Sequence, residues 1–176
     1  ARSLLSAAGS DARIVAKIER SEAIPRLDEI VQASDAVMVA RGDLGIEVGY
    51  AELTGLQKHI LQVARKHDRV TITATQMMES MIQSPVPTRA EVSDVANAVL
   101  DGSDAVMLSG ESAVGKYPVR AVEAMSEVIV GAEKYQIARN SRGERFEGRV
   151  SEFAQAIAHA VMYTANHMAV EAIVAL

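Results

Sequence analysis

Six side chains that could support acid–base, metal-binding or phosphoryl chemistry stand at the ends of short apolar runs. They are Lys17, Glu19, Arg41, Asp43, Thr75 and Ser109. Two carboxylates without a neighbouring histidine or thiol favour a hard cation, and Mg²⁺ often takes one or two protein carboxylates and completes its shell with water and substrate oxygens. A lysine beside such an ion would stabilise negative charge on a phosphoryl group or an enolate. These residue types favour an anionic small substrate that forms an enolate or transfers a phosphoryl group.

The stretch 37–47 is the most informative, because an apolar run breaks at Gly42 between Arg41 and Asp43. A buried strand that ends in charged side chains is how α/β enzymes present catalytic groups. If a short helical turn follows, the backbone amides of Gly42 and Asp43 would form a site for a substrate carboxylate. Thr75 would bind the same group or orient a proton donor. The alternative is an arginine–aspartate pair that only stabilises a turn.

Four apolar runs are predicted to be strands, each followed by a helical pattern. They cover residues 14–19, 36–41, 70–75 and 105–109. The segment 34–38 recurs as 103–107, which indicates a βα unit used more than once. Parallel strands joined by helices build either a (β/α)8 barrel or an open doubly wound sheet.

Alternation along the first strand places Ala16 and Ile18 on a face that packs on helices, and Lys17 and Glu19 on the other face. Neighbouring strands lie about 4.8 Å apart, so Glu19 and Asp43 could share one cation. The alternative for this strand is an exposed edge with a simple Lys17–Glu19 pair.

Longer helices are predicted at 21–33, 51–67, 88–101, 118–132 and 151–168. Thr88 and Glu91 form a capping-box pattern, and Pro118 suits the first position of a helix. The apolar cluster around Met77 and Met81 is interpreted as core or as a subunit contact.

Residues 136–150 lose apolar periodicity and become polar, so we expect a linker there. It would separate a domain at 1–135 from the start of a second α/β domain at 151–176, which includes a strand at 172–176. Because the chain begins without methionine and stops inside this apolar run, we expect it to be a piece of a longer protein.

The composition is that of an ordinary globular domain: 176 residues, 49% of them hydrophobic, with a net charge of −5. No basic patch with interleaved aromatic residues is present, so we expect no nucleic-acid partner. No apolar run is long enough to span a membrane, so we expect no membrane association. The absence of cysteine excludes a thiol nucleophile and fits a reducing compartment, and we expect the cytoplasm.

Several longer motifs resemble those of the bacterial-type pyruvate kinase family, in order and at the family's spacing. They are Lys17–Glu19, Met38–Gly45, Ala74–Met81, Pro87–Glu91, Asp94–Gly102 and Met107–Glu111. The resemblance covers about residues 12 to 135. It implies that the four strands are the last four of a (β/α)8 barrel, and that the tail begins the family's C-terminal domain.

The resemblance also implies roles for individual residues in transferring a phosphoryl group from phosphoenolpyruvate to ADP. Glu19 and Asp43 would bind Mg²⁺, and Lys17 would stabilise the transferring group. The backbone of Gly42 and Asp43, with Thr75, would hold the substrate carboxylate. Thr75 and Ser109 would lie near the proton path to the enolate, and Arg41 is counted among the substrate-binding residues. The family further implies K⁺, with ligands outside this segment, and a homotetramer.

Ser112 departs from the family's usual threonine, and the first half of the barrel is absent from the chain, so we expect this segment alone to be inactive. Two other functions stay open. One is a Mg²⁺-dependent lyase or aldolase of the pyruvate-enolate barrels, which needs no lysine for a transferred phosphoryl group. The other is a structural or interaction fragment without activity.

Overall fold

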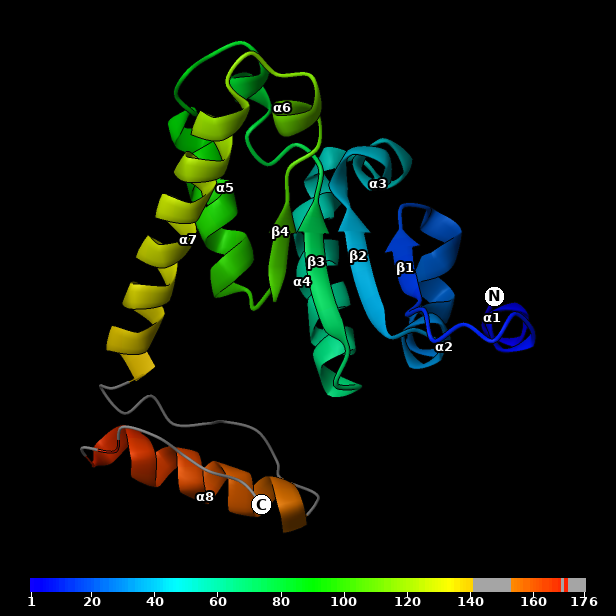
Figure 1. Ribbon diagram of the computed structural model, residues 1–176. Coiled ribbons are helices and arrows are strands. Elements are labelled where there is room, and N and C mark those ends of the chain that lie inside the picture. The colour runs from blue at the N-terminus through cyan, green and yellow to red at the C-terminus, as the bar shows by residue number, and fades with distance from the viewer. Residues whose placement is uncertain (141–152, 169, 171–176) are drawn as a thin grey trace. The chain divides into compact units, whose positions relative to one another are not determined.

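The computed structural model describes residues 1–140, 153–168 and 170, and divides the chain into two units, 1–132 and 133–176. The first unit contains a four-stranded parallel sheet in the order β1-β2-β3-β4 (Figure 1). Its strands are β1 (Val15–Ile18), β2 (Ala36–Ala40), β3 (Val70–Ala74) and β4 (Ala105–Met107). The prediction of an α/β fold with parallel strands is therefore confirmed.

The helices of the described chain follow the strands in alternation. They are α1 (Arg2–Ala7), the 3₁₀ helix η1 (Ser21–Arg26), α2 (Leu27–Ala33), α3 (Arg41–Val48), α4 (Tyr50–Lys66), the 3₁₀ helix η2 (Glu79–Ile82), α5 (Arg89–Leu100), α6 (Gly110–Ala113), α7 (Pro118–Asn140) and α8 (Phe153–His167). Within the part of the chain that the structure describes, no helix is both long and apolar enough to cross a membrane.

Strand register places the ends of the strands at one level. Ala40 pairs with Ala74, and Ala74 pairs with Met107, so the residues that follow these three begin at the same edge of the sheet. At the other side, Ile18 pairs with Val39, which puts the end of β1 one residue below the end of β2. The register therefore delivers the polar residues after each strand to a common edge.

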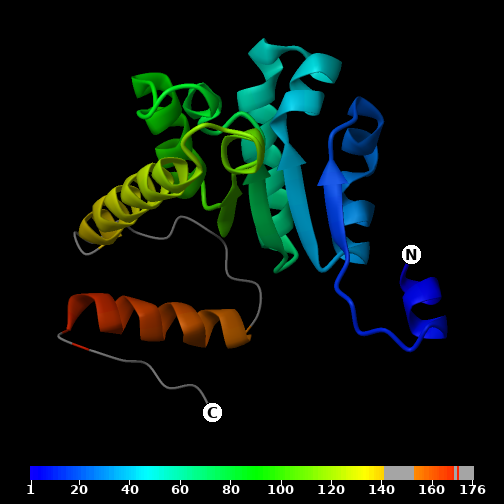
Figure 2. The same cartoon turned by 45° about the horizontal axis from the view of Figure 1, so that its top comes forward.

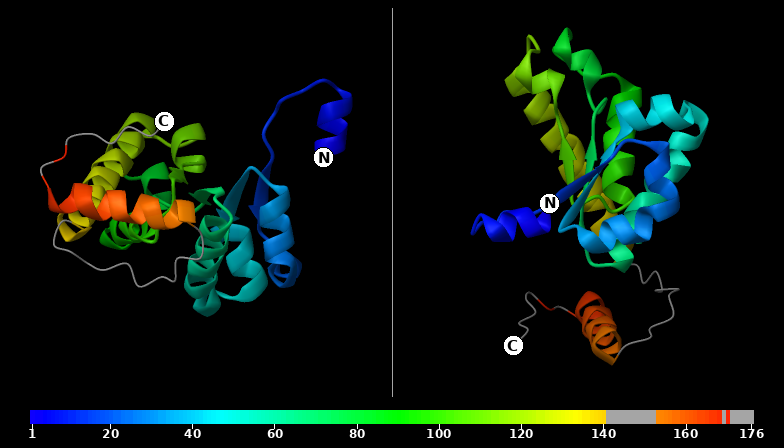
Figure 3. Two further views of the ribbon diagram at one scale, coloured as in Figure 1. Left: turned by 90° about the horizontal axis from the view of Figure 1, so that it is seen from below. Right: turned by 90° about the vertical axis from the view of Figure 1, so that its right-hand side faces the viewer.

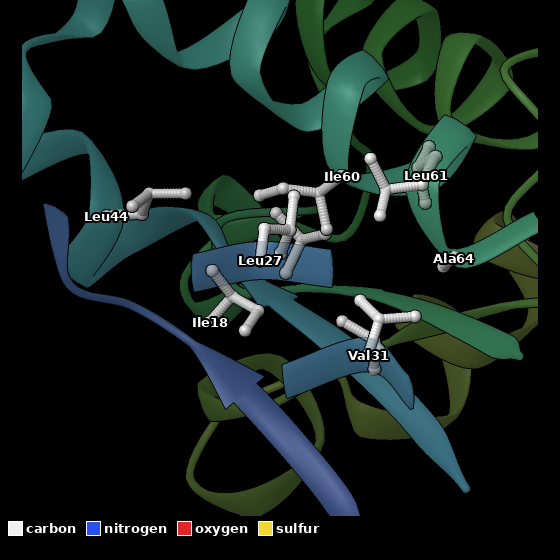
Figure 4. Close-up of a cluster of buried hydrophobic side chains, with 10 residues drawn as sticks. Ile18, Leu27, Val31, Leu44, Ile60, Leu61 and Ala64 are labelled. Atoms are coloured by element: carbon white, nitrogen blue, oxygen red, sulfur yellow. The ribbon is translucent and has the colours of Figure 1, made fainter. Parts of the chain in front are cut away.

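The helices α2 and α4 lie on one face of the sheet (Figure 3). Side chains of β1 and β2 pack there against both helices in a cluster that includes Ile18, Leu27, Val31, Leu44 and Ile60, all at most 2% exposed (Figure 4). Full burial of such a side chain contributes about 1.5–3 kcal/mol. The predicted inward face of β1 is thus confirmed.

A second buried cluster lies beneath the loop that follows β3. Met77, Met78 and Met81 are fully buried against Val95 of α5 and Met125 of α7. Methionine fills irregular gaps in cores because its unbranched side chain adapts its shape. The interpretation of these methionines as core is confirmed, and their burial anchors the loop that carries Thr75.

Two helix predictions need correction. The helix expected at 21–33 is divided into η1 and α2, because Pro25 lies inside η1, where its missing amide cannot form the α-helical hydrogen bond. Ser21, the first residue of η1, donates through its hydroxyl to Glu47 at 3.2 Å. The helix expected to end at 132 continues as α7 to Asn140, so residues 136–140 are helical.

The remainder of the expected linker, 141–150, and the expected strand at 172–176 lie outside the described residues. The other helices differ from their predicted bounds by only a few residues. The capping box is present: Thr88 Oγ1 accepts a hydrogen bond from the Glu91 amide, and the Glu91 carboxylate accepts one from the Thr88 amide.

Candidate functional site

The carboxyl ends of the four strands form the edge of the sheet that Figure 2 turns toward the viewer. Lys17 is the next-to-last residue of β1, and Glu19 follows that strand directly. Arg41, Gly42 and Asp43 form the first turn of α3, immediately after β2. Thr75 follows β3. Ser109 is the N-cap residue of α6, shortly after β4.

Lys17 joins the two predicted metal ligands. Its Nζ forms an ion pair with the Glu19 carboxylate and lies 3.4 Å from Asp43 Oδ2. The hydrogen bond with Glu19 is the largest influence on Lys17 and raises its pKa above the usual value, with Asp43 acting in the same direction. All three side chains are at least 36% exposed, so substrate and ions can reach them.

The arrangement fits a hard cation, because both carboxylates reach one positively charged group, here the ammonium of Lys17. Among residues 1–140, 153–168 and 170, no group of three or more histidine, cysteine or acidic residues could hold a metal. A two-carboxylate site would leave most of the coordination shell to water and substrate oxygens, as Mg²⁺ commonly has it.

Two hollows adjoin this cluster. One, of about 680 Å³, is lined by Lys17 and Glu19 together with residues of η1 and α2. The other, of about 300 Å³, lies between Glu19 and Asp43 and is also lined by Arg20, Ile46 and Glu47. A small anion could therefore approach Lys17 and the two carboxylates from solvent.

Thr75 and Gly42 form a second group of contacts. The Gly42 amide donates to Thr75 Oγ1 at 2.8 Å, and Thr75 Oγ1 donates to the Ala74 carbonyl at 2.7 Å. A Cβ at position 42 would lie 3.4 Å from Thr75 Oγ1, which is an ordinary van der Waals contact, so this hydrogen bond does not by itself require a glycine. The predicted proximity of the α3 amides and the Thr75 hydroxyl is present in this geometry.

The backbone at Thr75 is unusual. Its φ is +66° and that of Gln76 is +52°. A positive φ is a genuine outlier for a β-branched residue, and such strain clusters at binding and catalytic sites. The outlier is therefore a structural reason, separate from any sequence motif, to include the loop after β3 in the candidate site.

Arg41 faces away from solvent, since it is only 5% exposed. Its guanidinium donates to the Thr75 carbonyl at 3.1 and 3.2 Å and to the Gln76 carbonyl at 2.7 Å, and it pairs with Asp94 at 2.5 Å. The sequence placed Arg41 among the substrate-binding residues. Its donors are directed at the loop and at Asp94, so in this structure Arg41 holds the loop, and its role in substrate binding stays a prediction.

Ser109 belongs to a third group, centred on Glu111. This carboxylate is 2% exposed and accepts hydrogen bonds from the amides of Met78 at 3.0 Å and Ser109 at 2.8 Å. Ser109 Oγ lies 3.5 Å from Glu111 Oε2. Sequence analysis missed Glu111 and Asp94 as supports of the site; the one signal in the sequence was an acid two residues after Ser109.

Comparison with known proteins identifies the family. The family model "Pyruvate kinase, barrel domain" matches residues 1–122. The chain is 58% identical to a pyruvate kinase of Buchnera aphidicola subsp. Baizongia pistaciae, over 91% of this chain and 34% of that protein. It is 56% identical to pyruvate kinase II of Salmonella typhimurium, over 96% of this chain and 35% of that protein.

A pyruvate kinase of Haemophilus influenzae is 53% identical, over 100% of this chain and 37% of that protein. The chain thus spans about a third of the length of the curated relatives it matches. The matched barrel region contains β1 to β4 and every site residue named above. The chain belongs to the pyruvate kinase family.

Proposed function

We propose that this chain supplies the second half of the catalytic barrel of a pyruvate kinase, which transfers a phosphoryl group from phosphoenolpyruvate to ADP and yields pyruvate and ATP. The observation that carries the proposal is the Lys17 ammonium between Glu19 and Asp43, at the strand ends and beside hollows open to solvent. One cation and two carboxylates at a strand edge suit a phosphorylated substrate and a divalent metal.

The sheet supports the barrel proposal. On the face opposite α2 and α4, Val15 is 46% exposed and Val70 is 51% exposed. In a (β/α)8 barrel this face is the interior, filled by side chains from all eight strands. The four strands of this sheet would be the last four, and the rest of the protein would cover Val15 and Val70.

Lys17 is the residue that we propose to act on the transferring group. Its ammonium is charged at neutral pH, as that of any lysine with an ordinary pKa, and can stabilise negative charge on the phosphoryl oxygens. Glu19 and Asp43 would hold Mg²⁺, which when bound supplies positive charge next to those oxygens. Both carboxylates and the ammonium are exposed enough to exchange partners when the substrate arrives.

Thr75, Gly42 and Asp43 would hold the carboxylate of phosphoenolpyruvate. The first amides of a helix have no partner within the helix, and α3 begins at Arg41. The Gly42 amide donates instead to Thr75 Oγ1, so the substrate carboxylate would take the place of that hydrogen bond. Thr75 and Ser109 carry the hydroxyl groups that we propose near the enolate carbon, where a proton must be delivered to complete pyruvate.

Further proposals rest on membership of the family alone. They are a requirement for K⁺, with ligands outside residues 1–176, a homotetrameric assembly, a cytoplasmic location, and a second domain that begins after 150.

Replacing Lys17 by methionine in the full-length protein that carries this chain tests the function. We expect phosphoryl transfer from phosphoenolpyruvate to ADP to fall by about 10²–10³, because one preorganised charge at the reacting group is lost. Exchange of the methyl protons of pyruvate with solvent should persist. Lys58→Met is the control, because Lys58 pairs with Asp101 on the helical layer.

A phosphoryl-transfer rate unchanged by Lys17→Met would contradict the proposal. If the protein cleaves or condenses pyruvate-derived substrates, and Lys17→Met leaves that activity unchanged, a lyase or aldolase of the pyruvate-enolate barrels would be favoured. A wild-type protein with neither activity would favour a structural or interaction role.

A further inference from the structure

The loop that begins at Thr75 is held in place by a charged side chain outside the proposed substrate site. We propose that Asp94, on α5, is a positioning residue: through Arg41 it maintains the conformation in which Thr75 and the Gly42 amide receive the substrate carboxylate. This inference rests on the proposed function and extends it to a residue that contacts no substrate.

Two consecutive residues of this loop, Thr75 and Gln76, have positive φ angles. Neither is glycine, and such conformations persist only where the surrounding structure enforces them. The enforcing groups must therefore act on the backbone of these two residues. Arg41 does so, because it donates to both of their carbonyl oxygens.

The Arg41 guanidinium forms a fork. Nε and Nη2 converge on the Thr75 carbonyl at 3.2 and 3.1 Å, and Nη2 also reaches the Gln76 carbonyl at 2.7 Å. Such a planar fork fixes direction as well as distance. With the Thr75 carbonyl fixed, its hydroxyl lies where the Gly42 amide donates to it at 2.8 Å.

Asp94 completes the coordination of Arg41 from the opposite side. Its Oδ2 lies 2.5 Å from Nη1, which none of the loop carbonyls contacts. A guanidinium that is 5% exposed needs a partner of opposite charge, or it will turn toward water. Without Asp94, Arg41 would turn toward the polar cleft of about 410 Å³ that it lines together with Gln76.

Asp94 is itself 44% exposed, on the cleft between α4 and α5. Truncating it therefore removes a charge without opening a hole in either hydrophobic cluster. This makes Asp94 a better probe than Arg41, whose removal would also leave three loop hydrogen bonds unmade.

Asp94→Ala in the full-length protein is the test, with Asp101→Ala as the matched control. Asp101, the C-cap residue of α5, forms an ion pair with Lys58 of α4, but it contacts no residue of the loop among its described hydrogen bonds. We expect Asp94→Ala to raise the KM for phosphoenolpyruvate about tenfold or more, because hydrogen bonds to a charged carboxylate are misplaced. The KM for ADP should not change.

Asp94→Glu should restore most of the lost affinity, because it returns the carboxylate on a longer arm. Hydrogen exchange at the Gly42 amide provides a readout that needs no activity: Asp94→Ala should accelerate it, and Asp101→Ala should not. If Asp94→Ala does not fold, Asp94→Asn takes its place, since it keeps an acceptor and loses only the charge.

Equal effects of Asp94→Ala and Asp101→Ala, or an unchanged KM with unchanged exchange at Gly42, would overturn the inference. A wild-type protein without phosphoryl transfer would refute the proposed function instead. In that case exchange at Gly42 still decides whether Asp94 positions the loop.

Discussion

Replacing Glu111 by glutamine should weaken the connection between the loop after β3 and the end of β4. The carboxylate is 2% exposed and uses one oxygen for each of two backbone amides, Oε1 for Met78 and Oε2 for Ser109. A glutamine side chain has one acceptor oxygen, and its other arm carries only donors. One of the two amides must therefore face an NH₂ group.

The expected cost follows from these contacts. A buried donor left without a partner costs about 1–3 kcal/mol, so Glu111→Gln should lower the free energy of unfolding by about that amount. The value should lie in the lower part of the range, because a neutral amide is less costly to bury than a carboxylate. Glu111→Ala removes both acceptors and should cost roughly twice as much.

Urea unfolding of the full-length protein measures the free energy, and hydrogen exchange of peptides that contain Met78 and Ser109 locates the change. Glu123→Gln is the control, because Glu123 is half exposed and its one ion pair among the described residues is with Arg120, one turn away on α7. Its loss should cost less than about 0.5 kcal/mol. If Glu111→Gln lowered the free energy of unfolding no more than this control, and the amides of Met78 and Ser109 stayed protected from exchange, the reasoning on Glu111 would be wrong.

Two further predictions concern stability. Burial by itself raises the pKa of Glu91, but hydrogen bonds from Ser80 and from the helix-capping residue Thr88 outweigh burial and lower the pKa. Glu91→Gln should therefore lower the free energy of unfolding by about 1–2 kcal/mol at neutral pH. This stabilisation is present above the unfolded-state pKa of about 4.3 and is lost as pH falls through the lower folded-state pKa. Urea unfolding should therefore show a smaller difference in unfolding free energy between the wild type and Glu91→Gln below about pH 4 than at about pH 7. Gly115→Ala should lower the free energy of unfolding by about 1–3 kcal/mol in the same assay, because the new Cβ would lie 2.3 Å from the Glu111 carbonyl oxygen. Gly131→Ala meets no atom within 4 Å and should be neutral or stabilising; equal effects at the two glycines would contradict the steric argument.

The sequence determined where the strands end and which residues follow them. Apolar runs of strand length that stop at charged or polar residues are local signals, so the amino-acid pattern alone was enough to place Lys17, Asp43, Thr75 and Ser109 at one edge of a sheet. The Thr88–Glu91 capping box is equally local, because its partners are three residues apart.

The length of α7 shows where local reasoning failed. Its apolar stripe fades after residue 132, and that was interpreted as the approach to a linker. Residues 133–140 contain no glycine or proline, however, and helix propensity does not require an apolar face. The absence of a helix-breaking residue was the better signal.

Only the tertiary structure decided how the site is held. Arg41 meets Asp94 across 53 positions and Thr75 across 34, while Glu111 meets Met78 across 33. No local sequence pattern predicts these contacts, because each depends on how packed strands and helices bring distant segments together. The left-handed backbone of Thr75 is likewise held by groups from α3 and, through Arg41, from α5, since a threonine by itself favours extended or helical conformations. Local patterns therefore determined which residues reach the site, and long-range contacts determined their orientation.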